Sequence, residues 1–254
     1  MWGATITARR IGIRSMLSEL RASLAAGGRP LWIAAAISVP GFALSSYCGF
    51  AGMLAPDMRS LSGVGVAIRL ALGILVMAAC YRAILKGPAG MWRVDGAMAR
   101  FAGGAALVVG AIAVFMLFAR LWTGAILTAL RLGPAEAVTA QTVIYTIVGI
   151  ALSVMFIRTH PWLAALAIGE ERPDIVDSWV KTGPIIVPLL AAWVVLVLPL
   201  MLIQALLNLT AIRYESLVPA HLGLAAATGI LIGAVALTTA LLNATALRII
   251  APRA

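Results

Sequence analysis

The chain has 254 residues, of which 63% are hydrophobic and 11% are charged, and its mean hydropathy is +1.05. A soluble domain carries about a quarter charged residues, so this composition excludes a water-exposed globular protein, and it excludes a disordered chain, a coiled coil and a secreted disulfide scaffold as well. The net charge of +10 does not indicate a nucleic-acid partner, because the charges of so apolar a chain must lie in short connections, beside lipid headgroups.

The first 29 residues are too polar to cross a membrane and are predicted to form a separate amphipathic helix. Its apolar stripe consists of Ile6, Ile13, Met16, Leu17, Leu20 and Leu24. Three arginines flank this stripe, Arg10, Arg14 and Arg21. A helix of this kind lies in the headgroup plane, where its arginines contact anionic lipids. Packing against the ends of the membrane spans is the alternative, and the two are compatible.

Residues 30–254 contain the predicted transmembrane domain. A helix needs about 20 apolar residues to cross a hydrocarbon core of about 30 Å. Six segments meet this length: 31–54, 64–85, 101–121, 138–157, 185–207 and 222–247. Their apolar residues form continuous runs, which favours helices over barrel strands. The sequence therefore predicts an all-α integral membrane protein with six transmembrane helices.

The basic residues indicate how the six spans are oriented. One side of the membrane receives 14 of the 19 Lys and Arg residues and the other side receives 4, while Arg69 stays inside the second span. Because Lys and Arg concentrate in cytoplasmic loops, both termini are predicted to be cytoplasmic, which agrees with an even number of spans, since that number places both termini on the same side. Seventeen arginines against two lysines, with abundant alanine, are typical of high-GC bacteria and favour a bacterial inner membrane.

Prolines lie inside two of the predicted spans, Pro40 in the first and both Pro188 and Pro199 in the fifth. Proline removes a backbone donor and bends a helix, which membranes tolerate where neighbouring groups satisfy the freed carbonyls. We therefore expect kinks in the first and fifth helices. They are either static bends or, in a transporter, hinges.

Arg69 is the only charge that falls clearly inside a predicted span. Charged groups in a membrane are costly unless they are paired or hydrated, so Arg69 is a candidate functional residue. It either snorkels to the interface and pairs with Asp57, Glu136 or Glu215, or it contacts an anion or a substrate.

Three pairs of polar residues recur at i, i+4 spacing in the last three spans. They are Gln141 with Tyr145, Gln204 with Asn208, and Thr239 with Asn243. Each pair shares one helical face and forms either interhelical hydrogen bonds, the commoner role, or part of a polar cavity. A small-residue face on the sixth span consists of Ala225, Gly229 and Gly233 and predicts close helix packing, within the chain or against another membrane subunit.

The connection between the fourth and fifth spans, residues 158–183, is predicted to be a cytoplasmic helical elbow. Pro161 follows His160 as a helix start, Gly169 ends that helix, and Pro173 opens a second short helix that runs to about Lys181. The elbow contains four acidic residues, Glu170, Glu171, Asp174 and Asp177. A solvated, acidic helix start explains them better than a metal site does.

The elbow resembles that of uncharacterised bacterial six-helix membrane proteins. These are the YciC-like group and the membrane domain attached to some glycerophosphoryl diester phosphodiesterases. The resemblance rests on the six-span topology and on Pro161, Ala165, Gly169, Trp179, Thr182 and Gly183. It implies the fold but no catalytic residues, because the phosphodiesterase chemistry belongs to a separate soluble domain.

No common catalytic motif is present in the sequence, and neither a metal site nor a cofactor site is expected. The leading hypothesis is a non-enzymatic inner-membrane protein with a structural, accessory or assembly role. The alternative is a transporter or permease-like protein for a lipid or small amphiphile. A third hypothesis, an integral-membrane enzyme of lipid metabolism, would have to use the elbow acids or His160.

Overall fold

The computed structural model describes residues 12–131, 133–214 and 219–251, and these residues form helices and no strand. Six helical segments are long and apolar enough to cross a membrane, which confirms an all-helical protein with six candidate membrane spans. The helices are α1 (Ile13–Leu54), η1 (Pro56–Met58), α2 (Ser60–Lys86), α3 (Gly96–Leu130), α4 (Pro134–Ala167), α5 (Ile175–Thr182), η2 (Gly183–Ile185), α6 (Ile186–Leu196), α7 (Leu198–Ile212) and α8 (Ala220–Ile250).

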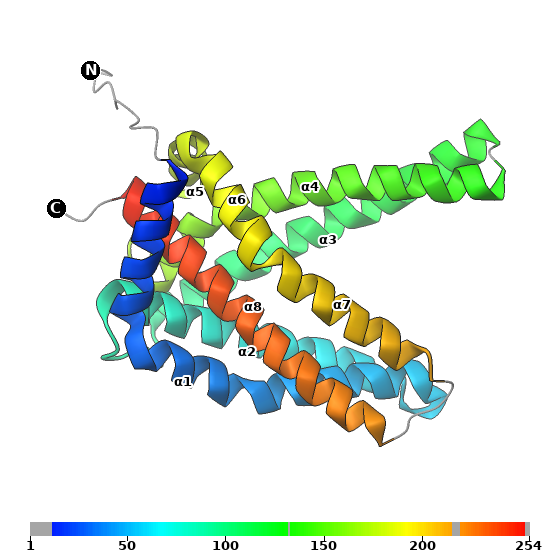
Figure 1. Cartoon of the computed structure of the whole chain (residues 1–254), viewed down its shortest axis with the longest axis horizontal. Helices are drawn as coiled ribbons and strands as arrows, with labels where there is room; N and C mark the ends of the chain where they lie inside the picture. Colours follow the sequence, from blue (N-terminus) through cyan, green and yellow to red (C-terminus); the bar gives the residue numbers. More distant parts are fainter. Residues whose placement is uncertain (1–11, 132, 215–218, 252–254) are drawn as a thin grey trace.

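Helix α1 consists of two parts that meet at Gly28, whose backbone is not helical (φ 50°, ψ −147°). Glycine adopts a positive φ at little cost, so it permits the sharp change of direction there. The part before Gly28 runs in a clearly different direction from the part after it (Figure 1). Pro40 lies inside the second part without a non-helical residue beside it.

The predicted fifth span is divided into α6 and α7, which confirms its expected distortion. Val197 separates the two helices (φ −99°, ψ −44°), and Pro199 lies in the first turn of α7. Proline has no N–H to donate to the carbonyl four residues earlier, which is that of Val195. The helix bends at this point rather than breaking, because the N–H of Val197 donates to the carbonyl oxygen of Trp193 at 2.8 Å and the N–H of Met201 donates to the carbonyl oxygen of Val197 at 3.1 Å.

Helix α4 corrects the sequence-based prediction of a separate helix that starts at Pro161. The helix is continuous to Ala167, with Pro161 in its interior, and Gly169 (φ 80°) terminates the segment. One interior proline removes a single hydrogen bond, which a long helix packed against its neighbours tolerates. The expected second helix of the elbow is present as α5, with Asp174 as its N-cap.

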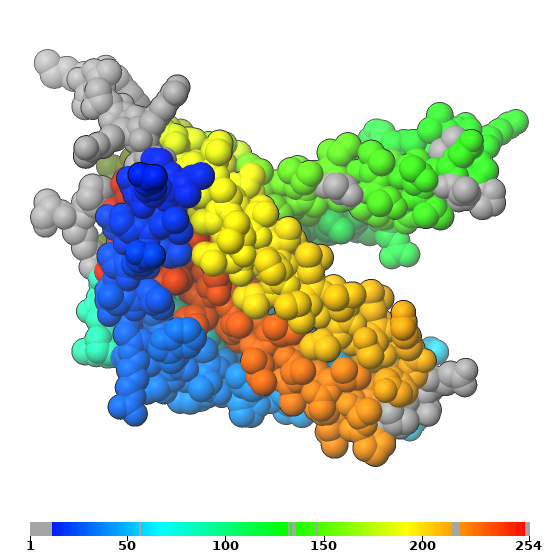
Figure 2. Space-filling view, viewed as in Figure 1, coloured from blue at the N-terminus to red at the C-terminus, as the bar shows by residue number. Residues whose placement is uncertain are grey.

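The helices form two groups that converge at one end of the molecule. Helices α1, α2, α6, α7 and α8 form the core group, in which α1 packs against both α2 and α8. Helices α3 and α4 form a hairpin that diverges from the core group toward the opposite end (Figure 1). The surface view shows an open wedge between the hairpin and helices α6–α7 (Figure 2). We call the end where the two groups meet the basic end, because Lys86, Arg93, Arg158 and Arg248 lie there.

The largest buried cluster lies at the basic end and includes residues from both groups. Tyr81 and Ile84 of α2, Phe101 of α3 and Ala164 of α4 belong to it, and Tyr81 meets Phe101 edge to face with 5.8 Å between ring centroids. The hairpin is therefore anchored at its base, whereas its far part lies away from the core group (Figure 1).

Candidate functional site

Arg69 contacts helix α1 rather than the described acidic residues. Its Nε donates to Ser45 Oγ at 3.2 Å and its Nη2 donates to Ser46 Oγ at 3.4 Å. The two ion pairs among the described residues have other members, and Glu215 lies outside the described residues. Arg69 therefore links α2 to α1.

The small-residue face of α8 packs against α1 of the same chain. A Cβ atom on Gly229 would lie 2.6 Å from the backbone nitrogen of Ala43, and one on Gly233 would lie 3.6 Å from the carbonyl oxygen of Ala35. Ala225 is buried nearby, in a cluster with Phe50 of α1. Glycine thus permits backbone contact between α8 and α1.

The three polar pairs occupy different environments. Gln141 is exposed and Tyr145 is half-buried, both on α4, while Gln204 and Asn208 are half-buried on α7. Thr239 and Asn243 of α8 are buried. The structure brings Asn243 together with Tyr81 and His160, which belonged to none of the predicted pairs.

The N-terminal part of α1 packs against the basic end of the core group along one edge. Met16 is buried in a cluster with Leu189 and Leu242, and Thr245 Oγ1 donates to Ser23 Oγ at 2.9 Å. The other face of this segment is exposed and consists of Ile13, Arg14, Leu17, Arg21 and Leu24. Arg10 lies outside the described residues.

A cavity of about 270 Å³ lies at the vertex of the wedge, where the hairpin meets α6, α7 and α8. Its lining consists of Ile112, Leu152, Ser153, Phe156, Trp193, Val197, Met201, Val235 and Thr239. The bend between α6 and α7 therefore borders the cavity at Val197. Of the six residues predicted to form a polar cavity, Thr239 is the one in this lining.

The polar groups of the cavity lining are few. Ser153 Oγ donates to the carbonyl oxygen of Gly149 at 2.8 Å. The indole Nε1 of Trp193 is shielded from solvent and has no hydrogen-bond partner. Most buried polar atoms in proteins are hydrogen-bonded, so an unpaired indole N–H requires an explanation.

A buried polar cluster beside Phe156 joins helices α2, α4 and α8. Asn243 Nδ2 lies 2.6 Å from His160 Nδ1 and donates to Tyr81 Oη at 3.2 Å, which is itself 3.2 Å from His160 Nδ1. The ring centroids of Phe156 and His160 are 3.7 Å apart. Since His160 Nδ1 faces the donors of this cluster, the neutral ring carries its proton on Nε2, an assignment that rests on the hydrogen-bond pattern. His160 Nε2 is buried without a partner.

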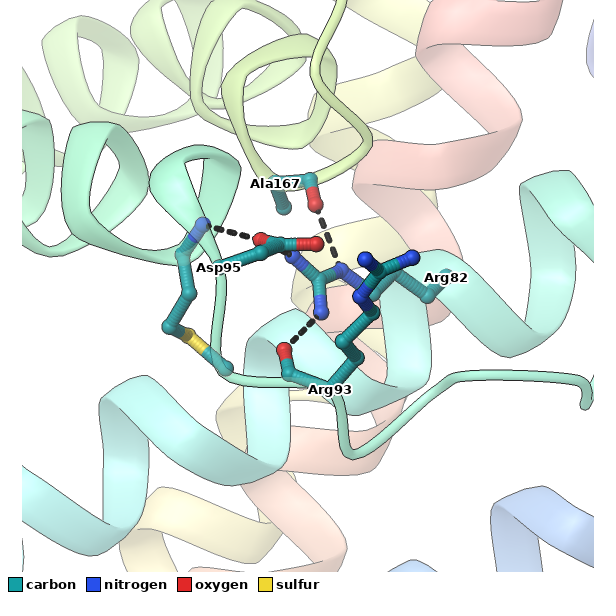
Figure 3. A network of polar contacts seen from close by, with 5 residues as sticks. Arg82, Arg93, Asp95 and Ala167 are labelled. Atoms are coloured by element: carbon teal, nitrogen blue, oxygen red, sulfur yellow. Dashed lines mark hydrogen bonds and ion pairs between the residues drawn. The ribbon is translucent and has the colours of Figure 1, made fainter.

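Arg82 ties the base of the hairpin to α2 (Figure 3). Its guanidinium donates to the carbonyl oxygens of Ala167, at 2.8 Å, and Arg93, and it pairs with Asp95 Oδ1 at 2.5 Å. Asp95 also caps α3 by accepting from the N–H of Met98 at 3.0 Å. That N–H, and secondly Arg82, hold the pKa of Asp95 below its ordinary value. The network closes the connection between α2 and α3 against the end of α4.

The elbow is fastened to α4 by Arg158. Its guanidinium donates to the carbonyl oxygen of Trp179 and lies 4.2 Å from the centroid of the Trp179 ring. Ser178 Oγ donates to the carbonyl oxygen of Arg158 at 2.6 Å. Among the elbow acids, Asp174 caps α5 and Asp177 pairs with Lys181 at 3.6 Å. No group of three or more potential metal ligands occurs among the described residues.

Apart from Thr239, sequence reasoning did not identify the residues that line the cavity. Trp193 and Phe156 are apolar residues in apolar spans, so their types carry no sign of a site. Tyr81 and His160 are 79 positions apart, and only the fold brings them together. A usable signal was available for Arg82, a basic residue at a span end with Asp95 in the following connection.

Comparisons with family models, curated proteins and solved structures found no match to this chain. The resemblance of its elbow to that of the YciC-like proteins therefore stays a prediction.

Proposed function

We propose that this is a non-enzymatic, permease-like membrane protein that binds a lipid or small amphiphile between its hairpin and its core group. The observation that carries the proposal is the cavity at the vertex of the wedge. Its lining comes from α3, α4, α6, α7 and α8 and is largely apolar, as suits an acyl or similar hydrocarbon chain. The wedge beyond it widens toward the far end of the hairpin (Figure 2), which gives a membrane-dissolved ligand a path to the cavity.

The bend in the fifth span supports a permease-like role, because transporters commonly place their binding sites beside distorted or discontinuous helices near the middle of the membrane. Val197, at the bend between α6 and α7, lines the cavity, and Trp193 and Met201 lie one turn to either side. A change at the bend would therefore alter the cavity directly.

The proposed location is a bacterial inner membrane with both termini in the cytoplasm. The distribution of 14 basic residues on one side against 4 on the other supports this orientation. Arg14 and Arg21, on the exposed face of the N-terminal segment, are then placed to contact anionic headgroups of the inner leaflet.

A cavity-filling substitution tests the proposal. Val235→Phe adds a ring to the lining, and Val195→Phe adds the same ring to a site on α6 that is 68% exposed. Both variants and the wild type are purified in a mild detergent, and their bound lipids are quantified by mass spectrometry. We expect one class of amphiphile to be enriched with the wild type and with Val195→Phe, and several-fold less of it with Val235→Phe. Equal retention by all three proteins would contradict the proposal.

Transport itself has a separate readout. Liposomes are loaded asymmetrically with the retained amphiphile, and its movement between leaflets is followed with and without the protein. The permease-like role predicts faster movement with the wild type and with Val195→Phe than with Val235→Phe. A protein that retains the amphiphile but does not move it would be a binding protein, which would reject the transport step alone.

An accessory or assembly role is the second candidate, favoured by the far part of the hairpin. Leu117, Leu121 and Trp122 of α3 are each more than half exposed, and this part of the hairpin lies away from the core group (Figure 1). A larger membrane complex could cover such a surface. Co-purification of a stoichiometric membrane partner that is lost with Leu117→Ser and Leu121→Ser would support this role, and an isolated monomer in native membranes would reject it.

A further inference from the structure

We infer that helix α5 of the elbow inserts its outer face among the acyl chains of the adjacent membrane leaflet, instead of lying in water as a solvated connection would. In the proposed orientation this is the cytoplasmic leaflet. The inference goes beyond the proposed function, because it concerns a second contact with lipid whose residues lie outside the cavity lining, and it does not depend on the cavity ligand.

The two faces of α5 have the reverse of the polarity that water selects. Ser178 and Thr182 are fully buried, whereas Val176 and Val180 are 66% and 67% exposed. Each valine is two residues from Ser178, which places it on roughly the opposite side of the helix. A surface helix in water buries its apolar stripe and exposes its polar face. The arrangement of α5 therefore matches an apolar environment around its outer face.

The packing of α5 on α4 fixes which face points outward. Ser178 Oγ donates to the carbonyl oxygen of Arg158 at 2.6 Å, and Thr182 Oγ1 accepts from Arg158 Nε at 3.5 Å. The guanidinium of Arg158 also donates to the carbonyl oxygen of Trp179. Turning α5 over to bury its valines would break these hydrogen bonds and leave buried polar groups unpaired. The exposure of the valines is thus imposed by the fold.

The outer face of α5 continues into the exposed surface of the fifth span. The candidate membrane span itself extends from Ile175 to Ile212 and includes α5. Beyond Val180, exposed apolar residues recur after four and three residues, at Pro184 and at Val187, which is 72% exposed. Side chains of this kind on a membrane span face lipid. This continuity favours acyl chains over a soluble protein as the occupant of the face.

A neighbouring segment presents a similar surface at the same end of the molecule (Figure 1). Met16, in the N-terminal part of α1, is buried in one cluster with Ile185 of η2, directly after α5. Ile13 and Leu17 of that segment are exposed, and Arg21 is exposed as well. Outward apolar side chains with basic residues beside them complement a leaflet that contains anionic lipids.

Spin labels measure which environment the outer face meets. The full-length protein first receives Cys48→Ala and Cys80→Ala, which replace its two buried thiols. One cysteine is then introduced and labelled with a nitroxide, and the protein is placed in nanodiscs of phosphatidylcholine and phosphatidylglycerol. Collisions are measured with oxygen, which concentrates in lipid, and with a water-soluble nickel chelate. The labelled sites are Val176→Cys and Val180→Cys, with Glu171→Cys in the exposed part of the elbow as the water reference and Val195→Cys on α6 as the lipid reference.

We expect the ratio of oxygen to nickel collisions at Val176→Cys and Val180→Cys to exceed that at Glu171→Cys several-fold and to approach that at Val195→Cys. A ratio equal to that at Glu171→Cys would overturn the inference, because the face would then lie in water and be free for a soluble partner. Slow collisions with both reagents, together with spin–spin broadening, would also overturn it, because a second copy of the chain would then cover the face.

Trp179 gives a second readout that needs no introduced cysteine. The emission that is lost in Trp179→Phe, which keeps an aromatic ring over Arg158, is assigned to Trp179. This emission should be quenched more by phosphatidylcholine brominated near the glycerol end of its acyl chains than by aqueous acrylamide, and the reverse order would contradict the inference. The cavity-filling variant Val235→Phe should leave both readouts unchanged, so failure of the proposed function and failure of this inference are distinguishable.

Discussion

The core group and the hairpin differ in how their helices are held. In the core group, α8 meets α1 through backbone contact at Gly229, and α2 meets α1 at Gly65, where a Cβ would lie 2.6 Å from the carbonyl oxygen of Ser45. The hairpin joins the core group at the basic end, through the large buried apolar cluster and through two polar connections, Arg82 and the Tyr81–His160–Asn243 cluster. Close packing along the length of one group, and attachment of the other group at its base, leave the wedge between them.

This difference has a physical basis in the membrane. Lipid tails are as apolar as leucine, so helices associate through close packing of small residues and through hydrogen bonds rather than through exclusion of water. The core group uses close packing along its length and adds hydrogen bonds such as that of Arg69 to Ser45. The hairpin uses both means at its base, and its far part diverges from the core group (Figure 1). The cavity therefore lies where the attached base of the hairpin ends and the hairpin begins to diverge from the core group.

The largest effect is expected from Gly229→Ala in the core group. The new Cβ would meet the backbone of α1 at 2.6 Å from Ala43 N and 2.9 Å from Val39 O, and backbone atoms cannot move aside as a flexible side chain can. We expect the free energy of unfolding to fall by about 3 kcal/mol, measured by unfolding the detergent-solubilised protein. Gly223→Ala, on the same helix with nothing within 4 Å, is the control and should leave stability unchanged or slightly higher. Equal effects of the two substitutions would show that α8 does not pack on α1 in this register.

A smaller effect is expected when the anchor of the hairpin is removed by Arg82→Met. The substitution leaves the carbonyl oxygens of Ala167 and Arg93 without their donor, while Asp95 keeps the N–H of Met98 and partial access to water. We expect the free energy of unfolding to fall by about 2 kcal/mol, and we expect faster amide hydrogen exchange at the start of α3 and the end of α4. The control is Arg93→Met, which retains the backbone carbonyl that Arg82 uses. Unchanged exchange in Arg82→Met would indicate that the hairpin is held by other means.

The smallest effect concerns pH. The pKa of Asp95 in the folded protein is below its ordinary value of 3.8, chiefly because of the Met98 N–H and then because of Arg82. The carboxylate therefore contributes stability above about pH 4, and this contribution is lost as the pH falls through the folded-state pKa. We expect the unfolding temperature of the wild type to fall more between pH 6 and pH 3 than that of Asp95→Asn, which can still cap α3. Parallel curves for the two proteins would contradict this role of Asp95.

The sequence predicted the parts of the fold that depend on composition and failed where spatial pairing decides. Hydropathy located six spans, and Pro199 indicated the distortion of the fifth. The position of Pro161 suggested a helix start because proline favours the first turn, but the packed environment of α4 keeps that helix continuous. The divergence of the hairpin could not be predicted, since lipid-facing and protein-facing apolar residues look alike in an apolar chain.

The candidate site was less predictable than the fold for the same reason. Arg69 was conspicuous because a charge in a span is rare, yet it lies against Ser45 and Ser46 and outside the cavity lining. Thr239 is in the lining, whereas the partners of Asn243 come from α2 and α4. Trp193 becomes notable only when its N–H is seen to be buried without a partner.

Photolabelling tests the central claim most directly, because it locates the ligand. Hexadecane with a diazirine at one end of its chain is irradiated with the protein in phosphatidylcholine nanodiscs, and the adducts are mapped by mass spectrometry. We predict adducts concentrated on the cavity-lining residues of α4 and α7, near Leu152, Phe156 and Met201, and suppressed by excess unlabelled hexadecane. Adducts spread over the exposed apolar faces, including Leu117 and Val195, and insensitive to competitor would contradict a ligand site between the hairpin and the core group.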